Sequence, residues 1–188
     1  MRNLLIALFL LAPCAAAAGE AGQAYTQKGC FYAVFPAGWV KGDEVLGLSD
    51  AEKKIYGMEF TGPSSGGLSA RISAQYYAPD NPLQKTSDKF IAMHNKPVLP
   101  GGNQGRAYGK VADGLAGNYY AKVFERKVFE YVPKRSINAK KVFVYEKFVV
   151  VPAKKGYYVL RYYAPMDLAK ANIKFFDAVL ASFKPLAR

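Results

Sequence analysis

The last segment of the chain, residues 156–184, constrains the fold most. It begins with GYYVLRYYAP, an apolar and aromatic stretch typical of a strand, and continues after Pro165 with DLAKANIKFFDAVLASF. The second stretch carries apolar residues at helical spacing, which predicts an amphipathic helix that packs on a sheet. A helix on a membrane surface is the rival interpretation. The predicted apolar stripe is Leu168, Phe175, Phe176, Val179, Leu180 and Phe183, opposite Lys170, Lys174 and Asp177.

The preceding residues can supply the sheet. Residues 68–77 alternate apolar and polar side chains, as a half-buried antiparallel strand does, and residues 142–151 are rich in β-branched and aromatic side chains. Residues 85–95 predict a helix that Thr86 or Ser87 caps. The expected fold class is therefore α+β: a twisted antiparallel β-sheet covered by helices, including the amphipathic C-terminal helix.

One long stretch has a less regular pattern. A turn is predicted at Asp113–Gly114, followed by a strand from Leu115 to about Val132. The alternation loses phase around residues 125–127, so we expect a bulge or a bend there.

The first residues differ in kind from the rest. A short positive start, an apolar run from Leu4 to Ala12 and the small residues 15–18 predict a secretory signal peptide over residues 1–18. Residues 19–28 are small and polar and predict a flexible lead-in, and residues 29–186 are expected to form a single domain. The mature protein is then periplasmic or secreted, and no later stretch predicts a transmembrane helix.

Cys14 offers an alternative to simple cleavage. The stretch LAPC resembles a degraded lipoprotein box, although Pro13 replaces the usual small residue before the cysteine. Lipidation of Cys14 would anchor the protein to a membrane. Cleavage after Ala18 leaves Cys30 as the one remaining cysteine, which we interpret as a buried apolar residue because it cannot form an internal disulfide.

The chain is strongly basic. It carries 26 Lys and Arg against 14 Asp and Glu, a net charge of +12, and loss of Arg2 with the signal peptide leaves 12 − 1 = +11. Most basic residues are expected at solvated turns, yet a positive field favours an anionic partner, such as an acidic envelope protein, anionic lipid or another polyanion. No nucleic-acid recognition motif is present in the sequence.

Catalytic and metal-binding patterns are absent from the sequence, so we predict no cofactor and no enzyme activity. The single histidine, His94, is interpreted as a helix-end residue, and no spacing of Cys, His and carboxylates suits a metal. The candidate carboxylates for an unrecognised hydrolase are Asp113, Glu125, Glu130 and Glu146. Glu125 and Glu130 have opposite parity on a strand, and basic neighbours such as Arg126 and Lys147 favour surface ion pairs.

Paired tyrosines are the remaining feature. The chain has 14 tyrosines, and adjacent pairs recur in predicted strands, where one ring of each pair faces inward and the other outward. Outward rings among Lys and Arg would form a contact surface, whereas a preference of tyrosine for strands explains the same pattern without a binding role. The candidate binding residues are Tyr77, Tyr119, Tyr157, Arg161 and Tyr163.

Two short motifs carry a family resemblance. FPAGW at residues 35–39, and YVL at 158–160 together with VLASFK at 179–184, resemble the PsbP-like superfamily, which comprises the photosystem II extrinsic protein PsbP and small exported bacterial relatives. The resemblance implies an antiparallel sheet flanked by helices, used for binding and scaffolding rather than catalysis. It transfers no functional residue, because the matching positions are core and turn positions, and it transfers no photosystem role.

These observations lead to one functional hypothesis with two alternatives. The hypothesis is a non-enzymatic exported binding or scaffold domain that contacts an acidic protein or another anionic partner through a basic, tyrosine-rich surface. The first alternative is a carrier of a small amphiphilic ligand between sheet and helix. The second is an unrecognised carboxylate-based hydrolase.

Overall fold

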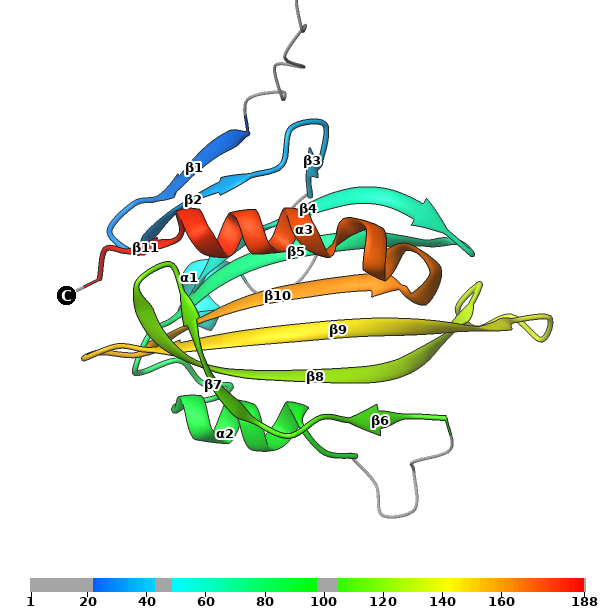
Figure 1. Ribbon diagram of the computed structural model, residues 1–188. Coiled ribbons are helices and arrows are strands. Elements are labelled where there is room, and N and C mark those ends of the chain that lie inside the picture. Colours follow the sequence, from blue (N-terminus) through cyan, green and yellow to red (C-terminus); the bar gives the residue numbers. More distant parts are fainter. Residues whose placement is uncertain (1–21, 43–48, 98–104, 188) are drawn as a thin grey trace, which may run out of the picture.

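The computed structural model describes residues 22–42, 49–97 and 105–187, and the predicted signal peptide and Cys14 lie outside them. A large antiparallel sheet dominates the fold (Figure 1). Its strand order is β3-β4-β5-β10-β9-β8-β6, and β7 also pairs with β8. The strands are β3 (Val40–Lys41), β4 (Ile55–Ser65), β5 (Leu68–Tyr77), β6 (Ala107–Tyr108), β7 (Ala112–Ala116), β8 (Tyr119–Val132), β9 (Lys140–Pro152) and β10 (Tyr157–Pro165).

A second, smaller sheet contains β1 (Gln23–Gln27), β2 (Phe31–Phe35) and β11 (Lys184–Pro185) in the order β1-β2-β11. The prediction that residues 19–28 form a flexible lead-in is therefore wrong over β1. This strand pairs with β2 in full register, and the ring of Tyr25 packs edge-on against Phe35 at 6.2 Å between ring centroids.

The predicted C-terminal helix is α3 (Met166–Ser182), and it covers one face of the large sheet (Figure 1). Phe176 and Val179 are fully buried on its inner side. The ring of Phe176 stacks on Tyr162 of the sheet at 5.8 Å, and the Tyr162 hydroxyl donates to the carbonyl oxygen of Ala169 at 3.0 Å. The sheet-packing interpretation of this helix is thus confirmed, as is the expected α+β class.

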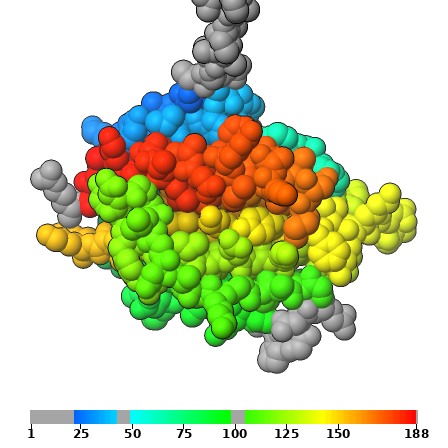
Figure 2. Space-filling model, viewed as in Figure 1, coloured from blue at the N-terminus to red at the C-terminus, as the bar shows by residue number. Residues whose placement is uncertain are grey.

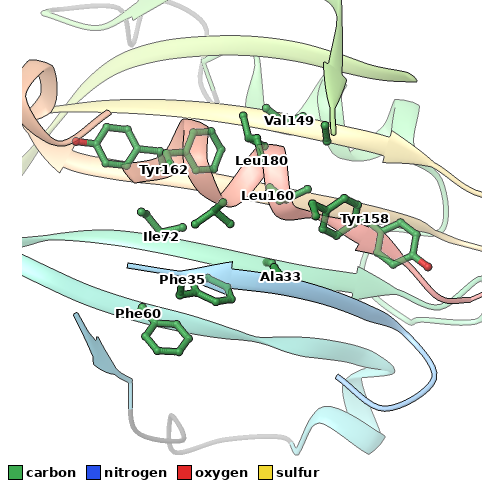
Figure 3. Close-up of a cluster of buried hydrophobic side chains, with 14 of the residues drawn as sticks. Ala33, Phe35, Phe60, Ile72, Val149, Tyr158, Leu160, Tyr162 and Leu180 are labelled. Atoms are coloured by element: carbon green, nitrogen blue, oxygen red, sulfur yellow. The ribbon is translucent and has the colours of Figure 1, made fainter. Parts of the chain in front are cut away.

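The small sheet closes the same core beside α3. Phe35 of β2 stacks on Phe60 of β4 at 4.2 Å between ring centroids, and Figure 3 shows both rings with Ile72 and Leu160 in this cluster. After α3 the chain returns to β2, where the Leu186 N–H donates to the carbonyl oxygen of Cys30 at 2.7 Å. Cys30 is buried, as predicted.

The opposite face of the large sheet is covered in part by α2 (Ser87–His94), and the short α1 (Asp50–Lys53) precedes β4. The side chain of Thr86 caps α2 by accepting from the N–H of Lys89 at 3.2 Å, which confirms the predicted cap. Phe90 is the buried residue of α2 and packs against Phe148 at 6.1 Å between ring centroids. Among the described residues, no helix is long and apolar enough to cross a membrane.

The predicted long strand is instead a hairpin. The chain turns at residues 117–118 between β7 and β8, so Asp113 and Gly114 lie inside a strand rather than at a turn. The predicted bulge at residues 125–127 is also wrong, because β8 pairs with β9 without interruption from Lys122 to Val132. The alternation loses phase because both faces of β8 are only partly covered, so apolar and polar side chains occur on each.

The turn between β4 and β5 approaches the loop end of the β8–β9 hairpin. Gly66 and Gly67 have positive φ angles of 59° and 79°. A Cβ atom on Gly67 would lie 2.7 Å from Cγ1 of Val132, although two strands separate β5 from β8 in the sheet. The sheet therefore curls over the face that carries α2, and side chains on that face are enclosed beyond the end of the helix.

Candidate functional site

Two predicted binding residues lie beneath α2. Tyr77 and Tyr157 are directly opposite on β5 and β10, and their rings stack at 4.8 Å between centroids. Phe90 of α2 covers them at 5.5 Å from the Tyr77 ring. Both rings are buried, so the prediction that they are part of an exposed surface is wrong. Alternation places a ring on the outer face of a strand, but α2 covers that face here.

Tyr163 is buried as well. The guanidinium carbon of Arg71 lies 4.0 Å from the centroid of its ring, and its hydroxyl donates to Glu130 Oε1 at 2.7 Å. The expectation of an exposed ring is therefore wrong for Tyr163 too. Arg161 remains partly exposed, but its guanidinium binds an internal partner, the carboxylate of Glu146.

Glu146 is the centre of a buried ion cluster that the sequence did not reveal. Its carboxylate is 1% exposed and accepts hydrogen bonds from Arg126 on β8 and Arg161 on β10. The expectation that basic neighbours such as Arg126 and Lys147 form surface ion pairs with the candidate carboxylates holds only in part. Arg126 does pair with Glu146, but the carboxylate is buried, and Lys147 faces α3 and pairs with Asp177 at 3.7 Å. Successive residues of β9 face opposite sides of the sheet, so Glu146 and Lys147 cannot share a partner.

The charge of Glu146 depends on its arginines. Burial raises the pKa of its carboxyl, but the charges and hydrogen bonds of Arg161 and Arg126 outweigh burial and hold the pKa below the ordinary value. The two guanidinium groups also lie over the ring of Phe148, at 5.1 Å for Arg126 and 5.6 Å for Arg161. Glu146 lies two residues from the buried Phe148 and therefore on the same face of β9. This spacing was the available sequence signal for the site, but it does not identify Arg126 and Arg161 as the partners of Glu146.

His94 lies at the end of α2 beside this cluster, as predicted for a helix-end residue. Its ring stacks on Phe90 at 4.0 Å, and Nδ1 lies 2.8 Å from the carbonyl oxygen of the same residue. Burial lowers the pKa of His94, and the positive charges of Arg126 and Arg161 lower it further, against the opposing effects of the Phe90 carbonyl and Glu146. Arg126 donates to the His94 carbonyl oxygen at 3.1 Å, which ties the helix end to the ion cluster.

The other candidate carboxylates are engaged separately. Asp113 accepts from the Tyr120 hydroxyl at 2.7 Å and from Lys122 Nζ at 2.6 Å on the exposed β7–β8 hairpin. Glu125 and Glu130 lie on opposite faces of β8, as their parity predicted. Over residues 22–42, 49–97 and 105–187 no group of three Cys, His, Asp or Glu side chains could hold a metal ion.

Tyr119 is the predicted residue that lies at an open groove. The groove has a volume of about 490 Å³ at the end of the sheet where β8 begins and β9 ends. Tyr119 and Tyr120 are 39% and 51% exposed and form one wall. The full lining is Tyr119, Tyr120, Val151, Pro152, Ala153, Lys154, Tyr158, Pro185 and Ala187.

The floor of this groove is held in place by hydrogen bonds. The Tyr158 hydroxyl donates to the carbonyl oxygen of Cys30 at 2.9 Å and accepts from the Ala187 N–H at 3.1 Å. Burial raises the pKa of Tyr158 to about 12, so its hydroxyl stays a donor at neutral pH. Lys154 is the charged residue of the lining, and no lining residue is acidic. The groove can therefore receive an anionic or aromatic group.

The fold and the site together define the class of the protein: an antiparallel sheet with helices on both faces, and an aromatic groove at one end. Solved structures identify the arrangement of sheet and helices as a PsbP-like fold. The solution structure of cyanobacterial PsbP (CyanoP) from Synechocystis sp. PCC 6803 matches with a TM-score of 0.50 and 16% identity, over 93% of this chain and 98% of that chain.

A crystal structure from Bacteroides thetaiotaomicron matches with a TM-score of 0.50 and 12% identity, over 88% of this chain. That match covers 48% of the Bacteroides chain, so this protein spans about half its length. No family model and no curated protein matches the sequence. At these identities the likeness shows the fold, and this is the PsbP-like fold that the sequence resemblance implied.

Proposed function

We propose that this protein is a non-enzymatic exported binding or scaffold domain, and that it contacts an acidic protein or another anionic partner through the groove of Tyr119, Tyr120 and Lys154. The observation that carries the proposal is the composition of the groove, where exposed tyrosines and a lysine line a pocket with no acidic residue. Tyrosine rings give contact area at low entropic cost, and the lysine selects an anionic group.

The wider charge distribution supports the same proposal. The net charge of 12 − 1 = +11 expected for the mature protein draws anionic partners toward the surface, and Lys155 adds an exposed cation beside Lys154. The absence of a catalytic pattern in the sequence and the engagement of His94 within α2 favour a binding role over catalysis. The predicted signal peptide supports export.

Capture from an envelope extract tests the proposal. The immobilised mature protein should retain an acidic protein at low salt and release it at high salt. The double variant Tyr119→Ala/Lys154→Gln should lose capture, whereas Tyr108→Ala/Lys110→Gln, which changes the same residue types outside the groove, should keep it. Capture that neither salt nor the groove variant reduces would contradict the proposal.

A second candidate function, carriage of a small amphiphile, rests on a different groove. The space between the sheet and α3 is filled by buried side chains such as Phe176, but a groove of about 670 Å³ lies between β2 and the outer side of α3. Phe175 contributes aromatic surface to it, whereas Phe35, also in its lining, is fully buried. Native mass spectrometry of gently purified protein should then show a bound ligand, and Ala178→Trp should displace it. A ligand-free mass would reject this candidate.

A further inference from the structure

The connection between β8 and β9, residues 133–139, projects beyond the body of the molecule (Figures 1 and 2). Ile137 lies at its tip with a side chain that is 101% exposed. A tight turn holds it there: the Ala139 N–H donates to the Ser136 carbonyl oxygen at 3.2 Å, and the Asn138 N–H donates to Ser136 Oγ at 3.2 Å. The exposure of this isoleucine is thus a property of an ordered turn.

Aromatic side chains lie directly behind the tip. Tyr131 and Phe143 are 55% and 43% exposed, although they are large apolar side chains. Phe129 lies between them, 5.5 Å from the ring of Tyr131 and 6.2 Å from the ring of Phe143. Lys141 places Nζ 4.0 Å from the centroid of Phe129, so a cation accompanies the rings. We call this surface the hairpin end. It comprises Ile137, the three aromatic residues and the basic residues Lys127, Lys134, Arg135, Lys140 and Lys141.

The hairpin end is also strongly basic. Residues 127–141 contain five basic side chains and one acidic side chain, a local charge of 5 − 1 = +4. The acidic residue, Glu130, is already engaged by the Tyr163 hydroxyl and by Lys134 at 3.7 Å. Within the described parts of the chain, Arg135 and Lys140 form no ion pair. Their charges are therefore available to an external anion. The five basic residues are Lys127, Lys134, Arg135, Lys140 and Lys141.

We infer that the hairpin end binds the surface of an anionic lipid bilayer. Ile137 enters the acyl boundary, the cations bind lipid phosphates, and the rings of Tyr131 and Phe143 lie at the interface, which aromatic side chains favour. The chemistry fits a bilayer better than an acidic protein. A protruding aliphatic tip needs a pocket of matching shape in a protein, whereas a fluid bilayer accepts it without one. This surface is separate from the groove of Tyr119, so the inference does not depend on the proposed function.

Vesicle co-sedimentation tests the inference. The mature protein should bind vesicles of phosphatidylcholine with phosphatidylglycerol and should not bind vesicles of phosphatidylcholine alone. Arg135→Gln/Lys140→Gln should weaken binding about 25-fold, since each cation near an anionic surface contributes about fivefold. Ile137→Asp should weaken it by at least about tenfold, because its side chain no longer enters the acyl boundary. All of these positions lie on an exposed hairpin, so the fold should persist, which circular dichroism checks.

Matched controls separate this site from general charge. Val40→Asp replaces another exposed aliphatic residue, and Lys89→Gln/Lys170→Gln removes the same charge elsewhere. Both controls should bind vesicles like the unmodified protein. Equal weakening by the control pair, or no effect of Ile137→Asp, would overturn the inference. Binding to soluble polyglutamate that needs Arg135 and Lys140, without any binding to vesicles, would also overturn it and assign the surface to an acidic polypeptide.

Discussion

Nε of Arg161 on β10 donates a hydrogen bond to Oε1 of Glu146 on β9 at 2.9 Å, in a site where the carboxylate is 1% exposed. Arg126 on β8 binds the other carboxylate oxygen. One carboxylate thus joins three neighbouring strands, and both guanidinium groups depend on it for charge balance. Buried ion clusters of this kind are costly to break on one side, because the remaining charges lose their partner.

Replacement of Glu146 by Gln should therefore destabilise the fold. We expect a loss of about 3 kcal/mol in the free energy of unfolding, since two partly buried arginines keep their charge without a counter-ion. Urea denaturation measures the loss. Glu59→Gln is the matched control: its carboxylate pairs with Arg71 at 3.5 Å but is 37% exposed, so the loss should stay below about 1 kcal/mol. Equal losses for the two variants would contradict the role of burial.

The same carboxylate predicts a pH dependence. Because the arginines hold the pKa of Glu146 below the ordinary 4.5 in the folded protein, the unfolded chain binds the proton first as the pH falls. The stabilisation is complete above pH 4.5 and is lost as the pH falls below it toward the folded pKa. The stability difference between the unmodified protein and Glu146→Gln should narrow over this range. A difference that stays constant through acid titration would refute the assignment.

His94 predicts a second pH effect at higher pH. Burial, followed by Arg126 and Arg161, lowers its pKa below 6.5, so the folded protein holds a neutral imidazole where the unfolded chain is protonated. The free energy of unfolding should fall as the pH drops below 6.5 toward the folded pKa. NMR titration of the single histidine measures this pKa directly. His94→Phe keeps the ring stack with Phe90 and should abolish this part of the pH dependence. If the free energy of unfolding of the variant falls with pH as steeply as that of the unmodified protein, His94 is not the group responsible.

Gly67→Ala tests the contact between the β4–β5 turn and the β8–β9 hairpin. The substitution introduces a Cβ at φ +79°, 2.7 Å from Cγ1 of Val132. Gly29→Ala is the control, because φ is +71° there and no atom lies within 4 Å of the added Cβ. The positive φ should lower the free energy of unfolding of each variant by about 1 kcal/mol. Crowding against Val132 should lower it by a further 1–3 kcal/mol, roughly, in Gly67→Ala alone.

A double variant separates crowding from backbone strain. Val132→Ala removes the methyl group that the new Cβ meets, so it should recover part of the stability that Gly67→Ala loses. The same change should recover nothing in the Gly29→Ala background. Thermal or urea unfolding of the unmodified protein, the three single variants and the two double variants measures the coupling, and strictly additive losses would show that the two glycines differ for another reason.

Local patterns predicted the elements whose signals are local. The stripe of α3 repeats within one helix, and the cap of α2 involves Thr86 and a residue three positions later, so both could be found from the chain alone. The ion cluster could not, because Glu146 meets Arg126 and Arg161 from positions 20 and 15 residues away. Spacing along a strand does not show which strand will be its neighbour.

The tyrosines illustrate a different limit. Alternation correctly separates Tyr157 from Tyr158 onto opposite faces, yet it does not show whether another element covers a face. Here α2 covers Tyr157, while the end of the β7–β8 hairpin leaves Tyr119 exposed. The groove depends on residues from three separate segments, so its shape follows only from the assembled fold.

The uninterrupted pairing of β8 with β9 has a mechanical consequence. Between Tyr119 at the groove and Val132 beside the loop that joins β8 to β9, β8 extends without a bulge, a span of roughly 40 Å for a regular strand. Hydrogen-bonded pairing with β7 and β9 restricts bending of β8, so β8 is a rigid element and not a hinge. If the hairpin end binds a bilayer and the groove binds a partner, the length of β8 would fix the distance between them. A partner in the groove would then lie about one strand length above the lipid headgroups.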